Sequence, residues 1–237
     1  MAKDTVVNSN FGALHGVNDA PLTFSEKLSD FIQKRRRALL VCAIGVVAIL
    51  VILIAVFSII GVAQSKSLSQ VEAFNRRYET LFPQLGDASK EADVQALVQE
   101  LAGFAPKHSG YAGAQAYSML AALHAEQKNW SEAESAWKAA AQTGAKTFLE
   151  PVYLFSAAVA AEEQSNTQDA LDLYTRCVAL ADHFPAAPRA QFAIGRLEEE
   201  LGQKDAALEA YRELARKWPD DATWTNLAQS KIIALSR

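Results

Sequence analysis

The stretch "NTQDALDLYTRCV", residues 166–178, has a near copy on each side of it. "NWSEAESAWKAAA" begins at residue 129 and "QKDAALEAYRELA" begins at residue 203, and the three align without gaps. The aligned columns hold an alanine, then an aromatic residue, then a small or apolar residue: Ala133, Ala170, Ala207; Trp137, Tyr174, Tyr211; Ala140, Cys177, Leu214. The constant spacing of 37 residues indicates a structural repeat.

Each copy has the pattern of one helix of a helical hairpin. Residues four apart share a face of an α-helix, so the aromatic ring covers the close crossing that the alanine permits. The same period holds upstream, where Ala121, Ala158 and Gly195 fall in the preceding helix of each unit. Chain breakers fit the same division, Asn166 and Gly202 within units and Pro151, Pro185, Pro188 and Pro219 between them. The sequence therefore predicts an all-α fold, an α-solenoid of helical hairpins.

Both ends of the array need a covering element, and the flanking sequence predicts two. Residues 222–235 are predicted to form a C-terminal capping helix with Trp224, Leu227, Ala228 and Leu235 on one side. Residues 66–82 and 89–104 are predicted to form an N-terminal hairpin with apolar residues at helical spacing: Leu68, Val71, Tyr78, Phe82, and then Val94, Leu97, Val98, Leu101, Phe104. Ala96 keeps the 37-residue register but Glu100 takes the aromatic position, which suggests a degenerate repeat.

A second feature is the uncharged stretch of 26 residues from Ala38 to Ala63, of which 17 are Leu, Ile, Val or Phe. As a helix it would be about 39 Å long, enough to cross a hydrocarbon core of about 30 Å with some tilt. We therefore predict a transmembrane helix at 38–63. Gly61-Val62-Ala63 could be a signal-peptidase site, but the apolar run is longer than the usual signal peptide and follows a polar leader of 37 residues. Retention as an anchor is the favoured interpretation.

The charges around this stretch predict its orientation. Lys34-Arg35-Arg36-Arg37 comes directly before it, whereas only Lys66 follows closely. By the positive-inside rule the N-terminus lies in the cytoplasm and residues 64–237 lie across the membrane. In a bacterium this is the inner membrane, with the C-terminal domain periplasmic, and in a eukaryote the domain would lie on a lumenal or extracellular face. Within the cytoplasmic leader, residues 1–37, a short amphipathic helix is predicted from a capping box at Thr23 and Glu26.

No constellation of residues predicts catalysis, a cofactor or a metal site. The four histidines are scattered, the two cysteines Cys42 and Cys177 lie in unrelated segments, and there is no glycine-rich phosphate loop, nucleophile elbow or Cys-x-x-Cys. After the apolar stretch, 17 basic residues face 23 acidic ones, so the balance disfavours nucleic-acid binding. We predict a protein that is not an enzyme and that binds no small-molecule substrate.

The repeated residues resemble those of the tetratricopeptide repeat family. That family has a small residue in its first helix, then alanine, aromatic and small residues in its second helix, and a closing proline. The unit with Gly195, Gly202, Ala207, Tyr211 and Pro219 fits best, although the period is 37 rather than 34 and the early tryptophan is missing. Taken together, these patterns predict a cytoplasmic leader at 1–37, an N-terminal hairpin at 64–110, three repeats at 111–221 and a cap at 222–237.

The resemblance further implies a partner-binding groove along the first helices of the repeats. Its candidate residues are Gln115 and Ser118, Phe155 and Val159, and Arg189, Phe192 and Arg196. Two phenylalanines near two arginines would suit an apolar peptide or helix with an acidic neighbour. The alternative is that the phenylalanines pack on the adjoining hairpin or cap and leave no groove.

The order of the parts and the stretch "NLAQSKIIAL" near the C-terminus are similar to the bacterial inner-membrane YfgM-like family. Members of that family are ancillary to the SecYEG translocon and associate with periplasmic chaperones. This resemblance implies a membrane-anchored adaptor in protein export or envelope assembly, whose partners are other proteins. The alternative function is structural, with the repeat domain associating with itself or with a membrane complex through its convex face.

Overall fold

A computed structural model describes residues 33, 35–180 and 184–237 of the chain. The helix predicted within the leader from the capping box at Thr23 lies outside the described residues. The chain divides into two compact units, Met1–Ile60 and Gly61–Arg237, and each is considered by itself. All regular structure in the described part is helical, so the predicted all-α class is confirmed.

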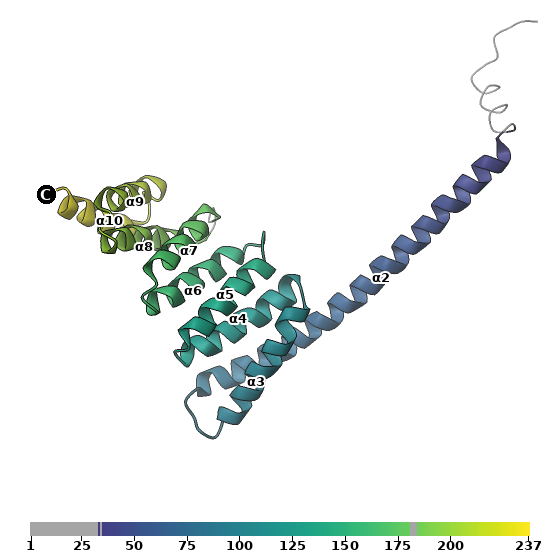
Figure 1. The fold of residues 1–237 in the computed structure, drawn as a ribbon, viewed down its shortest axis with the longest axis horizontal. Coiled ribbons are helices and arrows are strands. Elements are labelled where there is room, and N and C mark those ends of the chain that lie inside the picture. The colour runs from purple at the N-terminus through teal and green to yellow at the C-terminus, as the bar shows by residue number, and fades with distance from the viewer. Residues whose placement is uncertain (1–32, 34, 181–183) are drawn as a thin grey trace, which may run out of the picture. The chain divides into compact units, whose positions relative to one another are not determined.

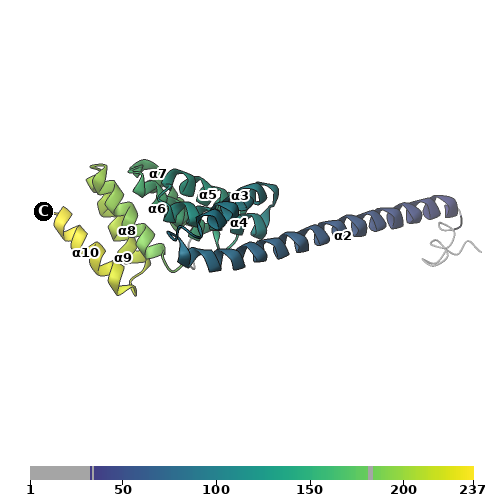
Figure 2. The ribbon, with the colours of Figure 1, turned by 90° about the horizontal axis from the view of Figure 1, so that it is seen from below.

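The first unit is described from the start of helix α2, Arg36–Leu81 (Figure 1). The apolar stretch lies in this helix, and every side chain described between Leu40 and Val62 is exposed. It is the one helix in the described residues that is long and apolar enough to cross a membrane, judged by length and composition. Figure 2 gives a second view of α2.

Helix α2 does not break at Gln64, where the sequence suggested a boundary between the apolar stretch and the N-terminal hairpin. The physical reason is local, since no proline follows the apolar stretch before Pro83. Within the second unit, the buried residues of α2 begin at Ser67 and Val71. Leu68 was predicted with the apolar residues of the N-terminal hairpin, but it is 41% exposed. A 3₁₀ turn, Phe82–Gln84, follows the helix.

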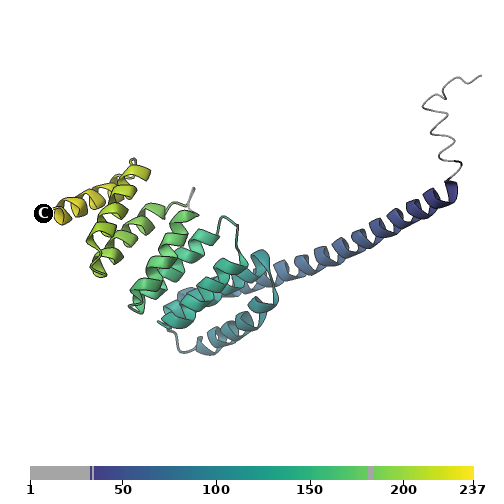
Figure 3. The ribbon, with the colours of Figure 1, turned by 45° about the horizontal axis from the view of Figure 1, so that its top comes forward.

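The second unit is a row of helices that pack in chain order (Figures 1 and 3). Its helices after α2 are α3, Glu91–Phe104; α4, Gly110–Glu126; α5, Trp130–Thr143; α6, Glu150–Glu163; α7, Thr167–Ala179; α8, Ala187–Glu200; α9, Lys204–Lys217; and α10, Ala222–Leu235, with a 3₁₀ turn at Ala105–Lys107. Three hairpins, α4 with α5, α6 with α7 and α8 with α9, make up the array. The predicted solenoid of helical hairpins is therefore the observed fold.

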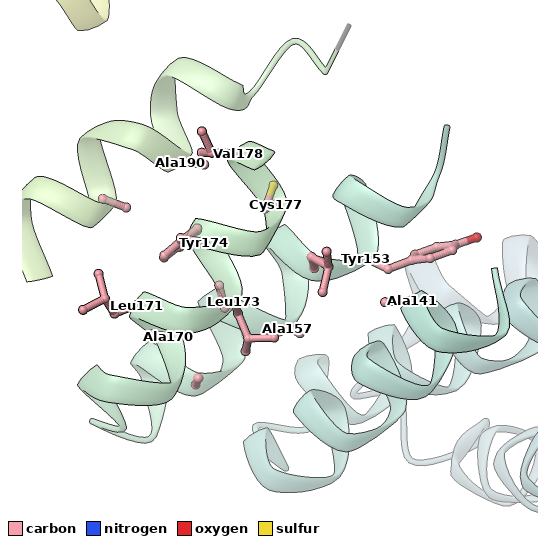
Figure 4. Close-up of a cluster of buried hydrophobic side chains, with 14 of the residues drawn as sticks. Ala141, Tyr153, Ala157, Ala170, Leu171, Leu173, Tyr174, Cys177, Val178 and Ala190 are labelled. Carbon is pink, nitrogen blue, oxygen red and sulfur yellow. The ribbon is translucent and has the colours of Figure 1, made fainter. Parts of the chain in front are cut away.

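The repeat columns coincide with the buried core. The alanines Ala133, Ala170 and Ala207 have no exposed surface, and neither do the residues seven positions later, Ala140, Cys177 and Leu214. Figure 4 shows Tyr174 and Cys177 of α7 among the buried side chains of the central cluster. Burial also raises the pKa of the Cys177 thiol to about 12, so the sulfur is protonated near neutral pH.

The turns inside the three hairpins each contain one residue with a positive φ angle, which the sequence pattern did not predict. Lys128, Ser165 and Gly202 have positive φ values of 59°, 60° and 75°, and they stand one repeat apart. Only the last is a glycine, the residue that adopts this conformation without steric cost. The repeat therefore holds its turn conformation even where the side chain disfavours it.

The ends of the array follow the repeat register less closely than its centre. In α3 the predicted apolar residues Val94, Leu97 and Leu101 are buried, whereas Ala96, which keeps the register in the sequence, is exposed. Glu100, at the missing aromatic position, forms a surface ion pair with Arg77 of α2 at 2.6 Å. The 37-residue register thus does not extend structurally to α3.

In α10, Trp224 and Ala228 pack inward as predicted, but Leu227 is 44% exposed. Asp221 accepts a hydrogen bond from the Trp224 backbone N–H at 3.2 Å and so caps this helix. The buried neighbour is Thr225, whose hydroxyl donates to the Trp218 carbonyl oxygen at 2.9 Å. The cap therefore turns the face centred on Thr225 and Ala228 toward α9.

Candidate protein-binding groove

A groove of about 340 Å³ lies over the first helices of the hairpins. Its walls come from the 3₁₀ turn after α2, from α4, α5 and α6, and from the start of α8. The lining residues are Phe82, Ala122, Ala125, Glu126, Trp130, Trp137, Phe155, Ser156, Val159, Ala160 and Arg189. This volume lies within the range of about 300–1,000 Å³ that is usual for ligand sites.

The apolar part of the groove is held by packing that continues into the core. Phe155 and Val159 are four residues apart on α6 and so share a helical face. The Phe155 ring meets the Tyr174 ring edge-on, with centroids 5.4 Å apart, and the Phe184 ring at 5.9 Å. Trp137 of α5 stacks on Tyr153 at 6.0 Å. These contacts fix the orientation of the two aromatic rings that line the groove.

Two charged side chains border the apolar part. Glu126 is the last residue of α4, and Arg189 lies in the first turn of α8. The Arg189 guanidinium carbon lies 5.2 Å from the centre of the Phe155 ring, a cation–π arrangement. Among the described residues neither Glu126 nor Arg189 has an ion-pair partner.

The structure brings together three of the seven residues that the sequence suggested for a groove: Phe155, Val159 and Arg189. Gln115 and Ser118 lie earlier on α4 and do not line it. Ser118 is buried and its hydroxyl donates to the Gln115 carbonyl oxygen at 3.0 Å, so it presents no polar group to a ligand.

Phe192 and Arg196 of α8 also lie outside the groove lining. The Phe192 ring packs against Tyr211 at 5.3 Å and against Trp224 of the cap at 5.4 Å. Phe192 therefore packs on the cap, as the alternative prediction had it, whereas Phe155 lines the groove. Arg196 forms an ion pair with Glu162 of the preceding repeat and is not available to a partner.

Sequence reasoning missed the groove's other aromatic residues and its acid. Trp137 occupies the repeat's aromatic column and was assigned to the core, and Phe82 was assigned to the N-terminal hairpin. Both are half-buried and line the groove as well as packing inward. The size of Trp137 could have indicated its role in the groove. It stands where the other repeats have tyrosine, and the larger side chain extends past the helix crossing.

Several polar groups elsewhere along the array pair with one another. The Lys138 Nζ atom of α5 lies 2.5 Å from a carboxylate oxygen of Glu134 on the same helix and 2.5 Å from one of Asp169 in the next repeat. Glu199 of α8 accepts hydrogen bonds from Tyr211 and from Lys231 of α10. The pKa of Tyr174 is raised, mainly by burial and to a smaller extent by the nearby Glu162 carboxylate, so its phenol is neutral. These groups serve contacts within the hairpins as well as between them.

Comparison with known proteins agrees with this geometry. Residues 188–230 match the family model for the tetratricopeptide repeat, and this range covers α8, α9 and the first part of the cap. This part of the chain is therefore similar to a tetratricopeptide repeat. Residues outside that range continue the same hairpin geometry, so we refer to the whole second unit as the repeat domain.

A relative named "TPR repeat-containing protein" from Treponema pallidum (strain Nichols) is 36% identical over 153 residues, which cover 64% of this chain. The match spans 63% of the relative's length. Among solved structures, the crystal structure of a point variant of a Podosopora anserina putative kinesin light chain with nearly identical TPR-like repeats is similar, with a TM-score of 0.50. It is 17% identical, and the match covers 72% of this chain and 85% of that one. This likeness concerns the fold alone.

Proposed function

We propose that this chain is a single-pass membrane protein whose repeat domain works as an adaptor and holds partner proteins in the groove over α4 and α6. The supporting observation is the groove itself, which presents Trp137, Phe155 and Val159 to solvent beside the charges of Glu126 and Arg189. Tetratricopeptide repeat proteins generally bind other proteins. Half-buried aromatic anchors in a pocket are typical of the residues that carry binding energy in protein interfaces.

The proposed location is the inner membrane of a bacterium, with the repeat domain on the periplasmic side. Support comes from the exposed apolar side chains of α2 and from the arginines that precede them. A protease added outside intact spheroplasts should therefore digest residues 64–237 and leave a protected fragment that contains the apolar stretch. A chain that is cut only after the spheroplasts are lysed would place the repeat domain in the cytoplasm and contradict the proposal.

On this proposal the partners are proteins of export or envelope assembly, such as the translocon or periplasmic chaperones, as the similarity to the YfgM-like family implies. Replacement of Val159 with aspartate places a carboxylate in the apolar part of the groove. We expect this variant to recover at least about tenfold less partner after crosslinking and immunoprecipitation, the loss of about 1.4 kcal/mol of binding free energy. Circular dichroism should show an unchanged helix content.

The matched control is Phe148→Asp, since Phe148 is 85% exposed in the connection between α5 and α6 and does not line the groove. Undiminished recovery with Val159→Asp would count against the groove. That result would favour the structural alternative, for which α10 offers the exposed side chains of Leu227 and Ile233. In that case Leu227→Asp should lower the oligomeric mass of the full chain in light scattering.

A further inference from the structure

The groove adjoins a second, polar hollow of about 540 Å³. This hollow lies between the turn after α2, the first turns of α3 and the end of α4. Its lining residues are Gln84, Leu85, Gly86, Asp87, Ala88, Glu91, Val94, Gln95, Glu126 and Gln127. Glu126 lines both cavities, and Phe82 of the groove is two residues from Gln84 of the hollow. The two cavities therefore meet at Glu126.

The hollow is acidic. Asp87, Glu91 and Glu126 line it, and none of its lining residues is lysine or arginine. The Ser89 backbone N–H donates to Asp87 at 2.8 Å, and this bond and the Ser89 hydroxyl lower the pKa of the Asp87 carboxyl. The Lys90 charge lies near Asp87 but outside the hollow. Among the described residues no ion pair involves Asp87, Glu91 or Glu126.

These unpaired charges contrast with the charges at the contacts between repeats. Glu162 with Arg196, and Asp169 with Lys138, neutralise each other at these contacts. The carboxylates of the hollow, and the Arg189 guanidinium that lies over Phe155 in the groove, have no such counterion from the described residues. Like charges gathered in one cavity repel each other, and a ligand of opposite charge relieves this repulsion.

We propose that the hollow and the groove together bind one segment of a partner protein that has a lysine or arginine at one end, large apolar residues in the middle and a carboxylate at the other end. This inference rests on the proposed adaptor function and specifies the partner's chemistry. The basic side chain lies in the hollow near Glu126 and Glu91. The apolar side chains pack on Trp137 and Val159, and the carboxylate pairs with Arg189.

The test uses the full-length chain in lipid nanodiscs and three fluorescein-labelled peptides with blocked ends. All three share the centre Ala-Leu-Phe-Ala-Leu, and their ends carry Lys-Lys and Glu-Glu, Glu-Glu at both ends, or Lys-Lys at both ends. Fluorescence anisotropy, with empty nanodiscs as the blank, gives the affinities. The mixed-charge peptide should bind tightest, and the peptide with only glutamates should bind at least about tenfold more weakly.

Glu126→Lys should remove most of the difference between these two peptides, because it changes the summed charge of the three acidic lining positions from −3 to −1. Lysine at this position also suits the C-terminal end of α4, so the variant should fold. Glu209→Lys makes the same charge change at an exposed position on α9, outside both cavities, and should leave the difference unchanged.

Equal binding of the three peptides, or equal effects of Glu126→Lys and Glu209→Lys, would overturn the proposed charge order. If Val159→Asp still removed binding in that case, the groove would stand without the hollow. Absence of binding by any peptide would also overturn the inference, while crosslinked partner recovery with Val159→Asp would decide the adaptor function separately. Light scattering could instead show that the chain self-associates and that the associated form does not bind the peptides. That result would assign the groove to a second copy of the chain and overturn the inference.

Discussion

Replacement of Tyr211 with alanine is expected to lower the free energy of unfolding of the repeat domain by about 3–5 kcal/mol, the cost typical of removing a buried aromatic ring. Tyr211 has no exposed surface and lies at the centre of the cluster that joins α8, α9 and the cap. Its ring lies so close to Gly195 that a Cβ at that glycine would be 2.5 Å from the ring. Gly195 has no side chain that could fill the space that the ring leaves.

The effect should be concentrated at the C-terminal end, because the stability of a repeat array is approximately the sum of terms between neighbours. Amide hydrogen exchange by mass spectrometry should show faster exchange in α8, α9 and α10, while α4 and α5 keep their protection. Urea unfolding followed by circular dichroism supplies the free energy. Uniformly faster exchange along the whole array would show that the domain unfolds as one unit.

Tyr211→Phe separates the ring from its hydroxyl. The hydroxyl donates to the Glu199 carboxylate at 2.5 Å, and hydrogen bonds to charged groups contribute about 1.5–3 kcal/mol. The phenylalanine variant should therefore lose less stability than the alanine variant. Tyr111→Ala is the surface control, since Tyr111 is 55% exposed, and its change should stay within about 0.5 kcal/mol. Equal losses for both Tyr211 variants would assign the stabilisation to the hydrogen bond instead of the ring.

The repeat core could be predicted from the sequence because each of its columns has one physical requirement. A close helix crossing admits only a small side chain, so Ala133, Ala170 and Ala207 report the crossing wherever it occurs. The ends of the array impose no such requirement. In α10 apolar residues stand on several sides of the helix, so the pattern could not show that Leu227 faces outward while Thr225 faces inward.

The candidate site was only partly predictable, because the exposure of a side chain depends on its neighbour along the array. Phe155 and Phe192 occupy equivalent positions one repeat apart. Helix α10 follows the last repeat and covers Phe192 with Trp224, whereas α8 places the Arg189 side chain over Phe155. The acidic hollow escaped prediction for a related reason, since Asp87 and Glu126 are distant in sequence and meet only through the fold.

Introduction of two arginines at the centre of the apolar stretch, Leu50→Arg with Leu53→Arg, is expected to abolish membrane insertion. On insertion scales each arginine at a helix centre costs about 2.5–3.5 kcal/mol, and each leucine lost removes a further 0.3–0.6 kcal/mol or so. The 17 Leu, Ile, Val and Phe residues supply at most about 5–10 kcal/mol on the same scale, less at the helix ends. The two changes therefore offset most of the driving force.

The matched control is Leu40→Arg with Val41→Arg at the start of the stretch. There the new side chains extend the existing arginine cluster and can reach the headgroups, and the 22 residues from Cys42 to Ala63 are still long enough to span. Carbonate extraction and flotation should leave the control in the bilayer fraction and release the central variant. Retention of both variants would show that another feature holds the chain at the membrane, and a mature chain that begins at Gln64 would make the stretch a cleaved signal.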